Sequence, residues 1–200
     1  DQFKNHILPD KVHILNVSFL VPRMRREFGG CAGNIAYNLH LLGGQPIPMG
    51  TVGSDFGPYR EYFEGLGIDL SRVRVIDELF TPQAFITTDH DNNQITAFHP
   101  GAMMRSYENH VRGVPGVTLG LVGPDGREGM IQNALEFHED GIPFIFDPGQ
   151  AMPLFNGPEL RAFIEQADYV VVNDYESNLL QERTGWDEQE IVSRVKAYIT

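Results

Sequence analysis

The chain has 200 residues, of which 42% are hydrophobic, which is enough for one sizeable core in one large domain or in one domain with a small appendage. Its formal net charge of −12 argues against a nucleic-acid-binding surface, and its single cysteine, Cys31, excludes an internal disulfide framework and a multi-cysteine zinc site. No apolar run approaches the length of a membrane span and no signal peptide is visible, so we expect a cytoplasmic protein without a membrane partner.

The N-terminal part of the chain predicts a strand and then a helix. Apolar and polar residues alternate over residues 12–21, as in a half-buried strand. The stretch Phe28-Gly29-Gly30-Cys31-Ala32-Gly33-Asn34 then opens a helix that Gly43-Gly44 ends. Apolar residues at helical spacing predict one buried face on this helix, made of Ala32, Ile35, Ala36, Leu39 and Leu42.

The start of this helix is a candidate binding site. The paired glycines, Gly29 and Gly30, allow backbone angles that other residues avoid, and they let a small molecule approach the main chain. Asn34 lies in the first turn, where its amide can both donate to and accept from a ligand hydroxyl. The glycines could instead form an ordinary turn and Asn34 could cap the helix, so the stretch alone leaves both interpretations open.

The middle of the chain predicts two short strands, a helix and a hairpin. The strands are expected at residues 46–52 and 72–76. The helix between them begins at Pro58 and has an apolar face made of Tyr59, Tyr62, Phe63 and Leu66. Strand-forming residues at 81–88 and 94–98 then flank a polar loop, which predicts the hairpin. We interpret this loop as turn chemistry and not as a calcium site, because it lacks the glycine and the closing glutamate of a calcium loop.

From residue 117 the chain alternates between apolar strands and helices. The expected strands are 117–122, 142–146 and 169–172, and the expected helices are 127–139, 158–167, 174–183 and one capped by Asp187 with Glu190. The apolar side of the first of these helices is expected to contain Met130, Ile131, Ala134, Leu135 and His138. This alternation predicts an α/β fold with a doubly wound, mainly parallel sheet that helices cover on both faces.

Polar residues follow two of these strands, at the end of the sheet where ligands bind. Asp147 follows the strand at 142–146, and Asn173-Asp174-Tyr175-Glu176 follows the strand at 169–172. We interpret Asp147 as a strand-end turn before Pro148. The spacing of Asn173 and Glu176 is that of a helix N-cap with its capping-box partner.

These motifs, in this order and spacing, resemble the ribokinase-like (PfkB-type) sugar and nucleoside kinases, and most closely the adenosine-kinase-like branch. Residues 29–39 look like the N-terminal signature of that family, and residues 52–57 look like its second glycine-rich turn. Gly67-Ile68-Asp69 matches its Gly-Ile/Val-Asp motif, and residues 173–176 match its Asn-x-x-Glu motif.

The resemblance implies a ribokinase-like domain and a reaction. The domain would cover residues 1–200 as a fragment incomplete at both ends, with a small β-sheet lid of strands at about 12–28 and 81–98. The reaction would transfer phosphate from ATP, with Mg²⁺, to a hydroxymethyl group of a nucleoside or a ribose-like sugar. A monovalent cation is a further candidate cofactor. The protein would be a monomer or a homodimer formed through the lid.

The resemblance also implies roles for individual residues. Gly29, Gly30 and Asn34 would bind the ribose hydroxyls of the acceptor. Asn173 and Glu176 would orient Mg²⁺-bound water near the ATP phosphates, a role that competes with ordinary helix capping.

Two aromatic residues of the expected lid bear on the identity of the acceptor. Phe19 and Phe85 could stack on a base, which favours a nucleoside over a free sugar, or they could simply pack in the lid. Residues 28–39 look closest to the adenosine-kinase-like branch, and this resemblance implies adenosine or another purine nucleoside as the acceptor.

The catalytic base of the family belongs to a Gly-Ala-Gly-Asp-type motif, which we expect beyond Thr200, so we assign no catalytic residue within the sequence. One alternative is a non-catalytic sugar- or nucleoside-binding regulator of the same fold. A nucleotide-dependent dehydrogenase would need Gly-x-Gly-x-x-Gly directly after a strand, and the sequence has no such motif.

Overall fold

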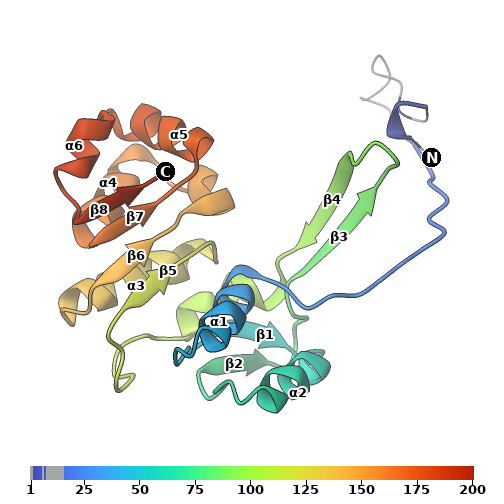
Figure 1. Ribbon diagram of the computed structural model, residues 1–200, viewed down its shortest axis with the longest axis horizontal. Coiled ribbons are helices and arrows are strands. Elements are labelled where there is room, and N and C mark those ends of the chain that lie inside the picture. The colour runs from blue at the N-terminus through green and yellow to red at the C-terminus, as the bar shows by residue number, and fades with distance from the viewer. Residues whose placement is uncertain (1, 6, 8–15) are drawn as a thin grey trace.

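The computed structural model describes residues 2–5, 7 and 16–200, and Figure 1 shows an α/β protein from which one long hairpin projects. The helices, with 3-10 turns labelled η, are η1 (Phe3–Asn5), α1 (Cys31–Leu41), α2 (Gly57–Gly65), η3 (Gly101–Glu108), α3 (Arg127–Glu139), η4 (Gly149–Leu154), α4 (Gly157–Gln166), α5 (Asp174–Thr184) and α6 (Glu188–Val192). The strands are β1 (Gly50–Gly53), β2 (Val73–Ile76), β3 (Gln83–Thr88), β4 (Gln94–His99), β5 (Gly120–Val122), β6 (Phe144–Phe146), β7 (Tyr169–Val171) and β8 (Ala197–Ile199). Within the described residues, no helix has both the length and the apolar character needed to cross a membrane.

The strands β5, β6, β7 and β8 form one parallel sheet in that spatial order. Helix α3 packs beside α4, and α4 packs beside α5, as expected when right-handed crossovers proceed in one direction across a sheet. Alternate strand residues are buried beneath these helices, whereas Leu121 and Ile199 on the other side are 39% and 53% exposed. The predicted parallel sheet is therefore present, and in the described part of the chain its second face is only partly covered.

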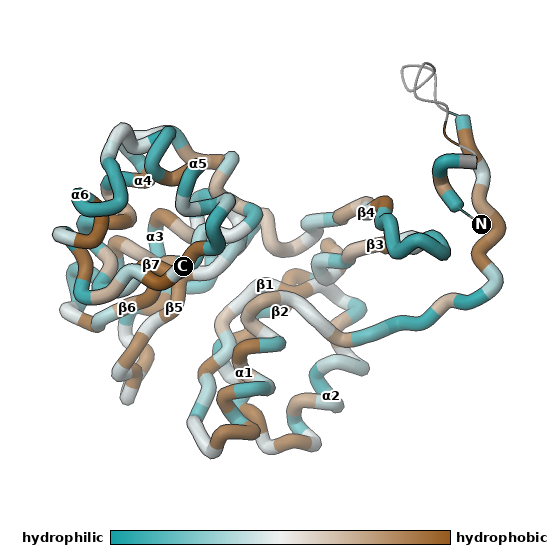
Figure 2. Tube along the Cα trace, turned by 45° about the horizontal axis from the view of Figure 1, so that its top comes forward, coloured by the Kyte–Doolittle hydropathy of each residue, from teal (hydrophilic) through white to brown (hydrophobic). Residues whose placement is uncertain are grey.

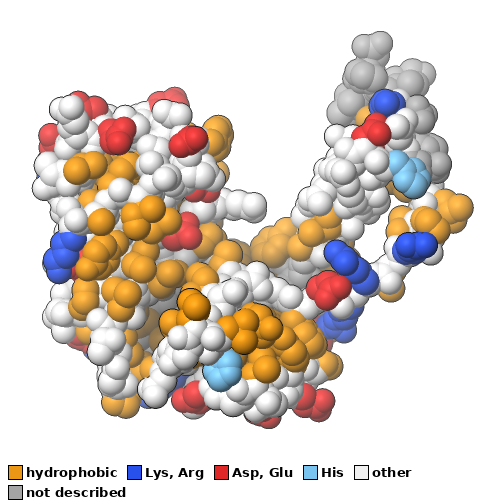
Figure 3. All heavy atoms as spheres, in the orientation of Figure 1, with side chains coloured by type: hydrophobic (Ala, Val, Ile, Leu, Met, Phe, Trp, Pro, Cys, Tyr) orange, Lys and Arg blue, Asp and Glu red, His pale blue; other side chains and the backbone are white. Residues whose placement is uncertain are grey.

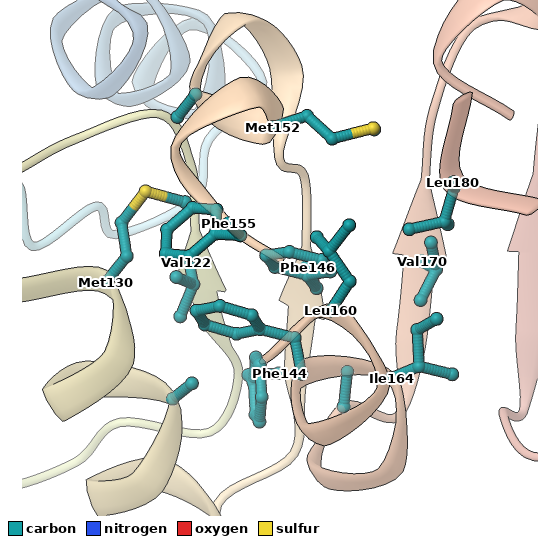
Figure 4. Close-up of a cluster of buried hydrophobic side chains, with 14 of the residues drawn as sticks. Val122, Met130, Phe144, Phe146, Met152, Phe155, Leu160, Ile164, Val170 and Leu180 are labelled. Carbon is teal, nitrogen blue, oxygen red and sulfur yellow. The ribbon is translucent and has the colours of Figure 1, made fainter. Parts of the chain in front are cut away.

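The main core lies between this sheet and its helices. Phe144 and Phe146 of β6 are fully buried, and Phe146 stacks on Phe163 of α4 with ring centroids 4.4 Å apart. Phe155 meets the edge of Phe163 at a centroid distance of 5.0 Å. Figure 4 shows side chains from the strands and from the surrounding helices converging in this cluster. Strand β6 pairs with β5 along one edge and with β7 along the other, and its phenylalanines are packed in the core. The ends of these three strands therefore have fixed relative positions.

A second, smaller core joins the parallel pair β1–β2 to α2. Its buried residues are Val52, Phe56, Phe63, Ile68 and Leu70. Phe63 confirms part of the predicted apolar face of α2, although Tyr62 is 40% exposed. Strand β1 begins later than predicted, because Pro46 and Pro48 have no N–H to donate to a strand ladder.

The predicted hairpin is confirmed, since β3 and β4 pair in antiparallel register over their full lengths. Its loop is formed by turn chemistry: Asp89 Oδ1 accepts the main-chain N–H groups of Asp91 and Asn93, each at 2.9 Å. Figure 2 shows this loop as hydrophilic. Phe85, Ile95 and other apolar residues of the two strands are exposed, so the hairpin stands apart from both cores.

The strand predicted over residues 12–21 is not confirmed. Residues 12–15 lie outside the described residues, and residues 16–21 run as unpaired chain on the way from the hairpin tip to α1 (Figure 1). An extended segment becomes a strand only where a neighbour pairs with its main chain, and no described strand does so here. Phe19 instead packs on Phe3 at a centroid distance of 4.9 Å, and the N–H of Phe3 donates to Asp89 at the hairpin tip.

Helix α1 has the predicted bounds, but the predicted buried face is wrong for most of its members. Ala36 is buried, whereas Ile35, Leu39 and Leu42 are 39%, 41% and 85% exposed. Ala32 is also exposed. The reason is that no element of the described chain packs over this apolar stripe.

Helix α3 also has the predicted bounds, with its buried face rotated from the prediction. Met130 and Ala134 are buried as expected, but Glu136 and Phe137 are buried as well, while Leu135 and His138 are exposed. The rotation follows from the packing of Phe137 on Phe144 of β6 at a centroid distance of 5.8 Å.

Candidate active site at the carboxyl ends of the strands

Three polar residues follow three neighbouring strands at one edge of the sheet, and we call this row the carboxyl edge. Asp125 follows β5, Asp147 follows β6 and Asn173 follows β7. The three strands are parallel, so their carboxyl ends meet at the same edge, where ligands of such sheets bind. The N–H of Asp147 donates to the carbonyl of Val122 at the end of β5, at 3.0 Å, which fixes the two ends relative to each other.

Asp125 was not among the residues that sequence reasoning selected, and it is the most perturbed carboxyl group of the carboxyl edge. Burial raises the pKa of Asp125 to about 6, even though the N–H of Gly126 donates to its Oδ1 at 2.7 Å and favours the charged form. The available signal was its place in Gly123-Pro124-Asp125-Gly126, directly after an apolar strand. Carboxyl groups with such shifted pKa values gather at functional sites.

Asp147 lies within electrostatic range of Glu176. Burial raises the pKa of Asp147 above its ordinary value, and the nearby charge of Glu176 raises it further. From sequence we interpreted Asp147 as a strand-end turn residue. The structure adds that its carboxyl group lies close enough to Glu176 for the two charges to interact.

The start of α1 faces the carboxyl edge. Burial raises the pKa of the Cys31 thiol, and the negative charges of Asp147 and Asp125 add to this effect. Figures 1 and 3 together show that α1 begins at the floor of a hollow between the sheet β5–β8 and the β3–β4 hairpin. The structure therefore brings the glycine-rich stretch to the same place as the polar strand ends.

The first turn of α1 is open to a ligand. Its N-cap residue, Gly30, has φ 88° and provides no side-chain hydrogen bond, so the glycine is needed here for its backbone conformation. Asn34 does not cap the helix: its carbonyl accepts from Asn38, and no hydrogen bond between described residues engages its side-chain amide, which is exposed. The capping alternative for Asn34 is therefore excluded, and its amide is free to bind.

Asn173 and Glu176 form the capping box that their spacing predicts. Asn173 Oδ1 accepts the N–H of Glu176, and Glu176 Oε2 accepts the N–H of Asn173, each at 2.9 Å. Asn156 and Glu159 form the same box at the start of α4. The Asn173 box lies after strand β7, at the carboxyl edge, whereas the Asn156 box lies after η4. The two boxes therefore differ in their position in the fold and not in their local geometry.

The two aromatic residues of the expected lid have different surroundings. Phe85 is 61% exposed on β3, and its ring is available to a ligand or to another surface. Phe19 packs on Phe3, which agrees with the packing alternative for this residue.

The carboxylates at the carboxyl edge, together with the nearby Glu176, suit a hard divalent cation held through water. Asp125, Asp147 and Glu176 are carboxylates, the ligands that Mg²⁺ prefers. Within the described residues, no three His, Cys, Asp or Glu side chains come close enough to enclose an ion directly. Mg²⁺ commonly keeps several waters and takes phosphate oxygens as ligands, so an incomplete protein cage fits it.

The raised pKa of Asp125 predicts a pH-dependent stability difference. Because the folded state disfavours the charge, wild-type stability should fall as the pH rises from about 4 through 6, whereas Asp125→Asn carries no charge. The melting temperature of the variant relative to wild type should therefore increase between pH 4.5 and 7.5, by about 2–4 °C for about 1 kcal/mol.

Asp125→Ala separates the charge from the hydrogen bond to Gly126. Its melting temperature relative to wild type should show the same increase with pH. At every pH this difference should be lower than for Asp125→Asn by a constant amount, because alanine cannot accept the N–H of Gly126. If both variants keep a constant difference from wild type across this range, the carboxyl group of Asp125 is not perturbed by folding.

Comparison with known proteins places this chain in a family. Residues 9–200 match the pfkB family carbohydrate kinase description. A nucleoside kinase of Methanocaldococcus jannaschii is 30% identical over 186 residues, which cover 92% of this chain and 61% of that protein.

Solved structures agree with this match. The nucleoside kinase of Burkholderia thailandensis in complex with inosine is 57% identical, has a TM-score of 0.86, and is matched over 93% of this chain and 61% of its own. The same kinase in complex with ADP-inosine is 57% identical with a TM-score of 0.85, over 99% of this chain and 62% of its own. The chain thus spans about three fifths of the length of these relatives. The match over nearly all of its residues shows that this chain belongs to the pfkB family of carbohydrate kinases and has the ribokinase-like fold.

Proposed function

We propose that the protein transfers a phosphoryl group from ATP to a hydroxymethyl group of a nucleoside, with adenosine or another purine nucleoside as the preferred acceptor, or of a ribose-like sugar. The observation that carries this proposal is the free amide of Asn34 in an uncapped helix start that faces the carboxyl edge. The inosine complex of the Burkholderia thailandensis relative supports a purine nucleoside, and its ADP-inosine complex supports ATP as the donor.

The acceptor would bind at the start of α1. The first N–H groups of a helix have no acceptor within the helix, so those of α1 can donate to ribose oxygens. The Asn34 amide can donate and accept, as a pair of neighbouring hydroxyl groups requires. Gly29 and Gly30 have no side chain to obstruct the ring, and a Cβ at either position would meet no atom within 4 Å, so the space beside them is open.

The phosphates of ATP would approach the carboxyl edge. Asn173 and Glu176 belong to the start of α5, where the helix dipole favours an anion. Glu176 uses Oε2 in its capping box and can direct Oε1 to a water molecule of a bound ion. When bound, Mg²⁺ would neutralise phosphate charge that Asp125, Asp147 and Glu176 would otherwise repel.

The β3–β4 hairpin would act as the lid of this site, together with the segment 12–28. Exposed apolar residues on a hairpin of only two strands are consistent with a surface that becomes covered, either on the site or against a second lid in a homodimer. A lid excludes water, which phosphoryl transfer to a sugar hydroxyl requires. We assign the whole of 1–200 to one domain, place the protein in the cytoplasm, and retain a monovalent cation as a candidate cofactor.

The test of the reaction is an ADP-release assay with the full-length protein, ATP and Mg²⁺. Adenosine, inosine, guanosine, ribose and fructose serve as acceptors, because they separate purine nucleosides from free sugars. We expect turnover with purine nucleosides. Measured binding of a nucleoside without any ADP release would favour the non-catalytic regulator instead.

Asn34→Ala should weaken acceptor binding and leave ATP binding nearly unchanged. Loss of its hydrogen bonds to a buried ligand should cost about 1–3 kcal/mol, or roughly five- to 150-fold in Kd, as measured by isothermal titration with the best acceptor. Asn38→Ala is the control, because its amide bonds within α1 to the carbonyl of Asn34. Equal acceptor affinity in wild type and Asn34→Ala would remove Asn34 from the site.

Glu176→Gln should lower kcat through Mg²⁺, since it keeps the size of the side chain and removes its charge. Loss of an outer-shell partner typically costs about 10–100-fold in metal affinity or activity, and raised Mg²⁺ should restore part of the rate. Glu159→Gln is the matched control, with the same capping-box geometry at the start of α4. If the two variants lose similar stability and share the wild-type Mg²⁺ profile, Glu176 is a capping residue and nothing more.

A further inference from the structure

A tyrosine of α2 forms a hydrogen bond to the main chain just before α1. Tyr59 of α2 donates its hydroxyl to the carbonyl of Gly29 at 3.0 Å. Among hydrogen bonds between described residues, this is the one that ties the main chain of residues 20–29 to another element. Gly29 and Gly30 have wide conformational freedom, so their geometry depends on such an external contact.

The same tyrosine ring also holds the neighbouring side chain. Phe28 stacks on Tyr59 with centroids 4.5 Å apart and planes 15° apart, and on Tyr62 with centroids 5.1 Å apart and planes 25° apart. Phe28 is nevertheless 42% exposed, so these two rings provide its main contact surface. The segment is thus fixed by one hydrogen bond to its main chain and by stacking on its side chain.

Gly33 makes room for this contact. A Cβ at Gly33 would lie 2.1 Å from the hydroxyl oxygen of Tyr59 and 3.2 Å from its Cζ. Gly33 lies inside α1 and has no positive φ, so the reason for a glycine is the close approach of Tyr59 and not the backbone conformation. The third glycine of the stretch and Tyr59 therefore form one steric unit.

We propose that Tyr59 is a positioning residue for acceptor binding, acting through the carbonyl of Gly29 to hold Gly29, Gly30 and the first turn of α1 in the binding geometry. This inference rests on the proposed function. It assigns Tyr59 no contact with the acceptor or with ATP. It also assigns Gly33 the separate task of admitting the tyrosine hydroxyl beside the helix.

The first test is Tyr59→Phe in the full-length protein, with kinetics for acceptor and ATP measured separately. Loss of one hydrogen bond should raise the acceptor KM about three- to tenfold, with the ATP KM unchanged. Tyr62→Phe is the matched control, because it removes a hydroxyl from the other ring that stacks on Phe28 and leaves the bond to Gly29 intact. Equal acceptor KM values for wild type and Tyr59→Phe, or equal increases in the two variants, would overturn the proposal.

A double variant tests the steric unit. Gly33→Ala should impair acceptor binding more than Tyr59→Phe, because its Cβ displaces the tyrosine and the segment together. Adding Tyr59→Phe to Gly33→Ala removes the 2.1 Å clash and should return the acceptor KM to the level of Tyr59→Phe alone. Additive losses in the double variant would overturn the proposed unit.

A measurement that does not depend on activity separates this inference from the proposed function. Cys31 is exposed and directly follows Gly30, so its modification rate by a thiol reagent, followed on the peptide that contains it, reports on this segment. Tyr59→Phe should increase the rate about threefold or more at unchanged melting temperature, and Tyr62→Phe should not. If wild type phosphorylates no acceptor, the proposed function fails, and the Cys31 rates alone then decide whether Tyr59 holds the segment.

Discussion

The parallel pairing of β5, β6 and β7 is the constraint on which the candidate site depends. Parallel strands bring their carboxyl ends to one edge, and here a polar residue follows each end within three positions. The burial of Phe144 and Phe146 in the main core stabilises this pairing, because it prevents β6 from shifting against its neighbours. A slip of one residue would exchange the two faces of the strand and would bury Ile145 in place of the phenylalanines. The core therefore fixes not only the fold but also which side chains stand in the row.

The electrostatics of this row are costly to the folded protein. Asp125 and Asp147 both have raised pKa values, mainly because they are buried, and Glu176 adds its charge beside Asp147. A protein of net charge −12 thus gathers carboxyl groups at the place where the proposed function puts the phosphates of ATP. Such an arrangement is unfavourable without a cation and becomes favourable with one. This is the pattern expected where function, and not stability, has selected the residues.

The fold class and most elements could be predicted from the sequence, because strand and helix periodicities are local. The bounds of α1 and α3 were predicted correctly, and the hairpin followed from its polar loop. The buried faces were less predictable, because they depend on the partner: Phe137 turned α3 by stacking on Phe144, and nothing in the described chain covers Leu39 of α1. The strand at 12–21 failed in its described part for the same reason, since a strand needs a neighbour that pairs with it.

The site was predictable in its parts and not in its assembly. Gly29, Gly30 and Asn34 carry a recognisable pattern, but the sequence alone could not separate a binding amide from a cap. Only the folded structure shows that the start of α1 lies near Asp125 and Asp147. The sequence places Asp125 after an apolar strand and Tyr59 on the apolar face of a helix, but it does not show that Asp125 is buried or that the Tyr59 hydroxyl reaches Gly29.

The helix starts of this protein show how position in the fold, and not local motif, assigns function. Helices α4 and α5 begin with the same capping box, Asn156 with Glu159 and Asn173 with Glu176, and each box satisfies N–H groups that would otherwise be unpaired. Helix α1 has no such cap, although a polar N-cap side chain would stabilise it by about 1 kcal/mol. A side chain that filled this position would also consume the N–H groups that face the hollow. Under the proposed function, the missing cap on α1 and the complete cap on α5 meet different requirements, since the first would leave donors for the acceptor and the second holds the carboxylate of Glu176 in a fixed orientation.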